Sequence, residues 1–166
     1  MLWLDMSFLE TQSSAWDAAH WEFSLVFEDL NDEDLWCRAD SRLLSVGEIV
    51  SHMVYSLLTY ASKLKPEFSS ESPLKRDEAR YYLNTVDRPF ALDMTVAEIA
   101  SEFDRVHKAV KEVFMQDSHS REDKLTFEGP GRTFGEFADY MVFHAAYHTG
   151  QAFSVRHLMG HKTNDN

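Results

Sequence analysis

The sequence predicts an all-α protein, a four-helix bundle with a long crossover between its second and third helices. Four segments place apolar residues at helical spacing. Each begins at a capping-box pattern, in which a Ser or Thr caps the helix start and a Glu three residues later reaches back to it. All four prolines lie outside these segments. The four patterns are Ser7/Glu10, Ser45/Glu48, Thr95/Glu98 and Thr133/Glu136.

The first helix is predicted over Ser7 to Leu30. Its apolar stripe contains one polar residue in register, His20, which we therefore expect to face the core. The stretch from Asn31 to Leu44 is acidic and then mixed. It predicts a loop that contains one short turn around Asp34 to Trp36.

The second helix is predicted over Ser45 to Lys63, with Glu48 and His52 on a polar stripe apart from its apolar side. Lys65 to Met94 follows, with three of the four prolines and no sustained period. It is far longer than the roughly 2 to 8 residues that usually join neighbouring helices. We expect a crossover with a short helix near Asp77 to Leu83. Such a link can return the chain to the starting end of the bundle, so the second and third helices need not be antiparallel neighbours.

The third helix, Thr95 to Gln116, has one apolar face and one charged face, and is interpreted as scaffold. A polar loop from Ser118 to Arg132 closes with Gly129-Pro130-Gly131. The fourth helix is predicted from Thr133 to about Met159, ending at Gly160.

Length and charge restrict the possible functions. The 166 residues suit one domain, residues 1–166. A net charge of -12 repels phosphate backbones and anionic membranes, so we expect no nucleic-acid or membrane partner. No run approaches the roughly 20 apolar residues of a membrane span, and we expect a cytoplasmic protein. The single cysteine, Cys37, excludes an internal disulfide and a cysteine-rich zinc site, and is interpreted as a bystander rather than a reactive thiol.

His144 and His148 lie four residues apart within the fourth helix. At about 100° per residue their rings lie roughly 40° apart, and two such imidazoles can chelate one divalent cation at about 2.0 to 2.1 Å. The alternative is a pair of hydrogen-bonded core or half-exposed histidines. A third ligand would decide between the two.

The distance along each helix selects candidates for that third ligand. His20 is level with the pair if the first and fourth helices run parallel, and His52 is level if the second helix runs antiparallel to both. His52 could instead belong to a solvated helix face, and His20 could be a hydrogen-bonded core residue. The remaining histidines, which we expect to be solvated, are His107, His119, His157 and His161.

Two stretches resemble the DinB/YfiT-like metalloenzyme family. The front stretch runs from Leu30 to Trp36 and continues with Ser45-Val46-Gly47-Glu48-Ile49-Val50-Ser51-His52. The closing stretch is His144-Ala145-Ala146-Tyr147-His148-Thr149-Gly150-Gln151, followed by Arg156, Leu158 and Gly160.

The resemblance implies a four-helix bundle with a three-histidine metal site, one ligand from the second helix and two from the fourth. Carried over to this chain, the ligands are His52, His144 and His148. The family is associated with nickel, zinc or other divalent ions, and some members are thiol-dependent S-transferases or isomerases that use low-molecular-weight thiols.

The leading hypothesis is an enzyme that uses one divalent metal ion, Ni or Zn, to transfer a group to a thiol or to hydrolyse a small-molecule substrate. The alternatives are a non-catalytic, stress-response bundle that binds a metal or small ligand, and a structural homodimer. No catalytic residue is assigned. Candidates for contacts behind the ligands or with substrate are His20, Glu48 and Gln151, although a capping-box role is the stronger interpretation of Glu48.

Overall fold

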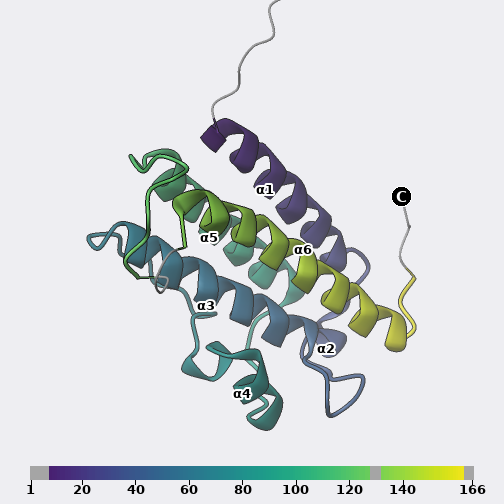
Figure 1. The fold of residues 1–166 in the computed structure, drawn as a ribbon. Coiled ribbons are helices and arrows are strands. Elements are labelled where there is room, and N and C mark those ends of the chain that lie inside the picture. The colour runs from purple at the N-terminus through teal and green to yellow at the C-terminus, as the bar shows by residue number, and fades with distance from the viewer. Residues whose placement is uncertain (1–7, 128–131, 163–166) are drawn as a thin grey trace, which may run out of the picture.

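The computed structural model describes residues 8–127 and 132–162, with the backbone alone for residues 82–84. Four long helices pack side by side as a bundle (Figure 1). Their bounds are α1 Phe8–Ser24, α3 Val46–Leu64, α5 Val96–Met115 and α6 Phe134–Leu158. The all-α bundle predicted from the sequence is therefore confirmed.

The four helices form two parallel pairs, α1 with α6 and α3 with α5 (Figure 1). At the carboxyl ends of α3 and α5, Nζ of Lys65 donates to Oε1 of Gln116 at 3.4 Å. Gln12 of α1 meets Asp139 of α6 near their starts. The long connection thus returns the chain to the end of the bundle where α3 began. As a result, α3 runs antiparallel to α6, the arrangement that brings His52 level with the pair on α6.

Capping boxes start three of the four helices as the sequence predicts. Ser45, Thr95 and Thr133 each accept a hydrogen bond from the backbone of the Glu three residues later, and that Glu side chain reaches back to the cap. Each box satisfies backbone N–H groups that have no partner within the helix. The fourth predicted cap, Ser7, and the turn at Gly129-Pro130-Gly131 lie outside the described residues.

The first helix ends earlier than predicted. Instead of reaching Leu30, α1 ends at Ser24 and continues as one 3₁₀ turn, η1 Leu25–Phe27. The buried guanidinium of Arg156 on α6 donates hydrogen bonds to the carbonyl oxygens of Leu25 and Val26. A carbonyl group that binds a side chain of another helix is turned away from the hydrogen bonds that would continue the α-helix. The apolar spacing along α1 contains no signal for this contact.

The predicted short turn is present as α2 Asp32–Leu35, capped by the side chain of Asn31. It is followed by Trp36, whose ring lies over Gly47 at the start of α3. A Cβ added to Gly47 would come within 2.5 Å of that ring. The glycine therefore permits the close approach of this aromatic ring to the helix backbone.

The crossover contains two short helical turns, η2 Asp77–Ala79 and α4 Tyr82–Asp87, where the sequence predicted one near Asp77 to Leu83. It is attached to α3 through a buried ion pair. Arg38 binds both carboxylate oxygens of Glu48, at 2.8 and 2.7 Å, and also donates to the carbonyls of Thr85 and Val86. Phe90 donates its backbone N–H to the same carboxylate.

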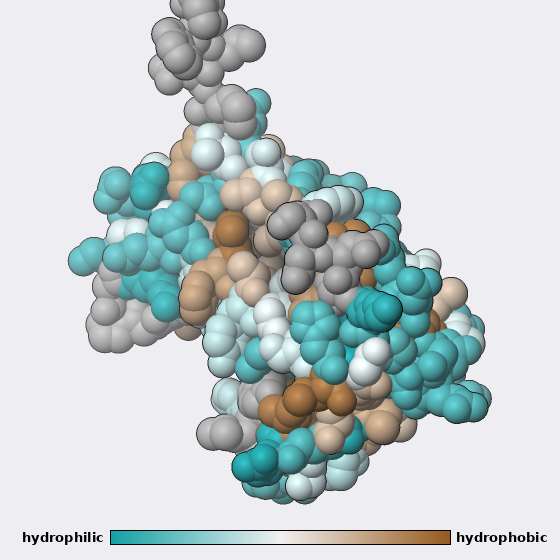
Figure 2. All heavy atoms as spheres, turned by 90° about the vertical axis from the view of Figure 1, so that its right-hand side faces the viewer, coloured by the Kyte–Doolittle hydropathy of each residue, from teal (hydrophilic) through white to brown (hydrophobic). Residues whose placement is uncertain are grey.

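A single apolar core fills the space between the four helices. In the view of Figure 2 the surface is mostly hydrophilic, and the apolar side chains gather in small separate groups. None of the described helices combines the length and the apolar character needed to cross a membrane. The fully buried aromatic and aliphatic residues at the centre include Phe23, Ile49, Phe103 and Phe137.

Replacing Glu48 with Gln should strongly destabilise the protein. The side chain of Glu48 is 1% exposed, and removing its charge leaves the Arg38 guanidinium without its partner. Breaking one half of a buried pair typically costs about 3 to 5 kcal/mol. Denaturant unfolding of the Glu48→Gln variant at neutral pH measures the loss.

Glu98→Gln is the matched control, because Glu98 has the same capping-box position on α5 but is exposed. It should lower the free energy of unfolding only slightly. Equal losses in the two variants would show that the cap, and not the pairing with Arg38, makes Glu48 important.

Candidate metal centre

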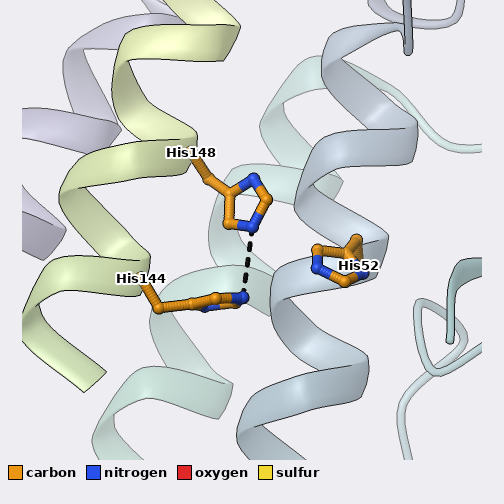
Figure 3. A group of neighbouring side chains, drawn as sticks. All are labelled: His52, His144 and His148. Carbon is orange, nitrogen blue, oxygen red and sulfur yellow. Dashed lines mark hydrogen bonds between the residues drawn. The ribbon is translucent and has the colours of Figure 1, made fainter. Parts of the chain in front are cut away.

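Three histidines from two helices meet in the interior of the bundle. Figure 3 shows His144 and His148 projecting from α6 toward His52 on α3. Their exposed fractions are 8%, 3% and 8% respectively. The structure therefore brings together the three residues that the sequence and the family resemblance selected, and it excludes the alternative in which His52 belongs to a solvated face.

The spacing of the donor nitrogens suits one cation. One ligand atom from each histidine lies within 4.8 Å of the other two. The Nε2 atoms of His144 and His148 are 3.1 Å apart. Two ligands bound at 2.0 to 2.1 Å on a tetrahedral ion are about 3.3 to 3.4 Å apart, so small side-chain shifts would suffice. This buried group could hold a metal ion.

Hydrogen bonds from Nδ1 orient two of the rings. His52 donates from Nδ1 to the carbonyl oxygen of Ala79 at 2.8 Å, and His148 donates from Nδ1 to Oε1 of Gln151 at 2.7 Å. In a neutral imidazole a proton on Nδ1 leaves the lone pair on Nε2. Such bonds behind a metal-binding histidine set its tautomer and its direction.

Burial keeps all three imidazoles neutral. Two effects lower the pKa of His144 to about 3: burial away from water, which is the larger, and charge repulsion from His148 and His52. Burial, followed by repulsion from His52, lowers the pKa of His148 to about 4, against the opposing effect of its hydrogen bond to Gln151. Burial also lowers the pKa of His52, against the opposing effect of its bond to Ala79. Only the neutral imidazole can bind a metal ion, so no imidazolium has to lose its charge before a metal ion binds over a wide pH range.

The contacts behind the ligands were only partly predictable. Gln151 was a candidate because it shares the face of the histidine pair. Tyr147 was not, although it precedes Gln151 by one helical turn and its hydroxyl accepts a hydrogen bond from the amide of Gln151 at 3.2 Å. Helical spacing could have found it. No sequence signal could have identified Ala79, because it contributes a backbone carbonyl.

The other two candidates have different roles. The carboxylate of Glu48 is held by Ser45, Arg38 and Phe90, so its contacts are those of a capping box and an ion pair. We find His20 between α1 and α5, with its ring stacked on His107 at 3.8 Å and its Nε2 3.5 Å from Asp104.

The prediction that His20 lies in the metal cavity therefore needs correction. The position of His20 along α1 was estimated correctly, because α1 and α6 run parallel. The side of α1 that carries His20, however, is turned toward α5. Desolvation, followed by repulsion from His107, lowers the pKa of His20 to about 4. His107 was expected to be solvated and is 4% exposed, because its ring packs between His20 and Trp16.

Among the other histidines expected in solvent, His157 is exposed, whereas His161 is largely buried and bonds to Asp34 at 2.8 Å. His119 is partly exposed and bonds to Asp117. None of the three contributes a ligand atom to the group formed by His52, His144 and His148.

Comparison with known protein families gives a match to the DinB superfamily over residues 15–152. No curated protein and no solved structure matched the chain. The matched region covers most of the chain and includes all three histidines of the buried group. The protein belongs to the DinB superfamily.

With a chelator present, the free energy of unfolding should fall as the pH is lowered from about 7.5 to 5. Unfolded histidines take up protons near pH 6.5, whereas His144 and His148 do so in the folded chain only near pH 3 to 4. Between these values the unfolded chain binds more protons, so stability is complete above pH 6.5 and is lost as the pH falls. At pH 5 each such histidine costs about 2 kcal/mol.

Denaturant unfolding across this range measures the effect. The His144→Gln variant should show a shallower pH dependence, because it has one fewer buried imidazole. Replacing the exposed His157 with Gln is the control and should leave the wild-type curve in place. A wild-type curve that is flat from pH 7.5 to 5 would contradict the burial of these rings as neutral groups.

Proposed function

We propose that this DinB-superfamily protein is a divalent-metal-dependent enzyme whose metal ion is held by His52, His144 and His148. The observation that carries the proposal is the convergence of three buried, neutral imidazoles from two antiparallel helices. Imidazole ligands suit Zn and Ni, and we propose one of these as the native metal. A bound divalent cation supplies Lewis-acid chemistry, which lowers the pKa of a thiol or water toward neutral.

The chain contributes orientation and a dry environment. Ala79 and Gln151 hold the rings of His52 and His148 through their Nδ1 atoms. Three neutral ligands leave the charge of a cation uncompensated, which favours an anionic ligand such as a thiolate at a remaining position. We propose that the reaction is a thiol-dependent S-transfer, or a related transfer or hydrolysis, with a low-molecular-weight thiol as one substrate.

A second candidate is a non-catalytic bundle that binds a metal or a small ligand. The burial of all three histidines favours it, because little of each ring is open to a substrate. Turnover distinguishes the candidates. Metal-loaded protein should conjugate a small thiol to a soluble electrophile faster than chelated protein does. Equal rates with and without metal would favour the second candidate.

Untagged protein should contain one divalent metal ion per chain, and His52→Ala should lose most of it, because His52 is the sole ligand from α3. Metal analysis of the purified proteins measures this. His20→Ala is the matched control, since His20 is a largely buried histidine outside the group. It should retain both the metal and any thiol-dependent turnover. Full metal occupancy in His52→Ala would contradict the ligand assignment.

Gln151→Ala should weaken metal affinity by about 10 to 100-fold without removing a ligand, because the His148 ring loses the bond that orients it. Competition with a chromogenic chelator measures the affinity. The control is Gln12→Ala, which removes a glutamine that bonds to Asp139 across α1 and α6. Unchanged affinity in Gln151→Ala would show that the His148 ring is held by its packing alone.

A further inference from the structure

Three aromatic side chains on α6 form a continuous surface beside the histidine group. We call Tyr140, Phe143 and Tyr147 the aromatic platform. The ring centroids of Tyr140 and Phe143 are 6.4 Å apart, and those of Phe143 and Tyr147 are 5.9 Å apart with 28° between the ring planes. Spacings of three and four residues place all three on one stripe of the helix.

The platform touches the proposed metal ligands at both of its ends. The Tyr140 ring lies 5.6 Å from that of His144, and the Tyr147 ring lies 5.2 Å from that of His148. Its outer part is open to solvent, since Phe143 is 61% exposed and Tyr147 is 52% exposed. A ligand on the platform therefore lies directly against the edge of the proposed metal site.

The exposed area fits a small molecule better than a second protein chain. A fully exposed aromatic side chain presents about 150 to 250 Å², so Phe143 and Tyr147 together offer roughly 200 Å². A stable protein interface needs about 800 Å² on each partner. An area of this size suits contact with an aromatic group of a small molecule.

Polar groups border the platform as well. The hydroxyl oxygen of Tyr147 accepts a hydrogen bond from Gln151, which leaves its own hydrogen to be directed at a ligand. The guanidinium of Arg132 lies over the ring of Tyr140, 4.9 Å from its centre. A substrate that carries both an apolar ring and a polar group would match this surface.

We propose that the aromatic platform binds an aromatic group of the substrate beside His144 and His148, the residues that would hold the metal ion. This inference rests on the proposed metal-dependent function and specifies its substrate class. Aromatic rings are favoured over aliphatic chains because stacked and edge-to-face contacts add to simple burial.

Thiol binding to Co²⁺-loaded protein tests the proposal. A thiolate that binds Co²⁺ produces a charge-transfer absorption, which gives dissociation constants for benzyl mercaptan and ethanethiol. Benzyl mercaptan should bind at least about tenfold more tightly than ethanethiol to the wild type. In Phe143→Ala the preference should fall to about threefold or less, while the d–d spectrum of the cobalt stays the same. Comparing the ratio between variants cancels the intrinsic difference between the two thiols.

Trp21→Ala is the matched control, because Trp21 is an aromatic residue of similar exposure, 54%, on α1. It should leave the preference at its wild-type value. A preference that survives in Phe143→Ala, or that is equally reduced in Trp21→Ala, would overturn the proposal. So would a wild-type dimer that Phe143→Ala converts to monomers, because the platform would then be an interface between chains.

Failure of the proposed function gives a different result, namely a cobalt d–d spectrum that stays that of free hydrated Co²⁺ when the protein is added. The platform is then tested separately by saturation-transfer NMR with benzyl alcohol and chelated protein. A signal in the wild type that is lost in Phe143→Ala would support an aromatic-binding surface without a metal. No signal in either protein would overturn the platform too.

Discussion

The buried carboxylate of Glu48 is the constraint on which the arrangement of the site depends. It closes the capping box that starts α3, accepts hydrogen bonds from Nε and Nη2 of Arg38 and accepts the N–H of Phe90. Arg38 in turn holds the carbonyls of Thr85 and Val86. One charge pair therefore joins the start of a core helix to the crossover. Breaking one half of a buried pair is costly, so this junction stabilises the attachment of the crossover to α3.

The same junction positions a metal-ligand candidate. Ala79 lies within the attached crossover, and its carbonyl holds His52, which is one helical turn after Glu48 on α3. The crossover thus lies behind the His52 ring and holds it directed toward α6. On the other side, His148 is oriented within its own helix by Gln151. The two helices use different means to fix their ligands, a backbone carbonyl from the crossover and a side chain one turn away.

The sequence predicts the helices, their caps and the histidine group because each depends on local spacing or on a motif. Ser45, Thr95 and Thr133 cap as expected, since a capping box involves only four consecutive residues. His20 was misplaced because its level along α1 follows from counting, whereas its direction depends on how α1 packs against α5. The early end of α1 depends on Arg156, which lies more than a hundred residues away in the chain. Packing between distant segments decides both.

The electrostatics of the group restrict what it can bind. Three neutral imidazoles add no negative charge, so a buried divalent cation keeps its full charge in surroundings of low dielectric constant. Removing such an ion from water is expensive, and the ligand bonds must offset that cost. An anionic thiolate or hydroxide at a further position would offset part of it by reducing the charge. The net charge of -12 opposes the approach of an anionic ligand to the protein, since it attracts cations and repels anions. A neutral thiol that loses its proton only on reaching the site would avoid this repulsion, which is consistent with the thiol substrate proposed above.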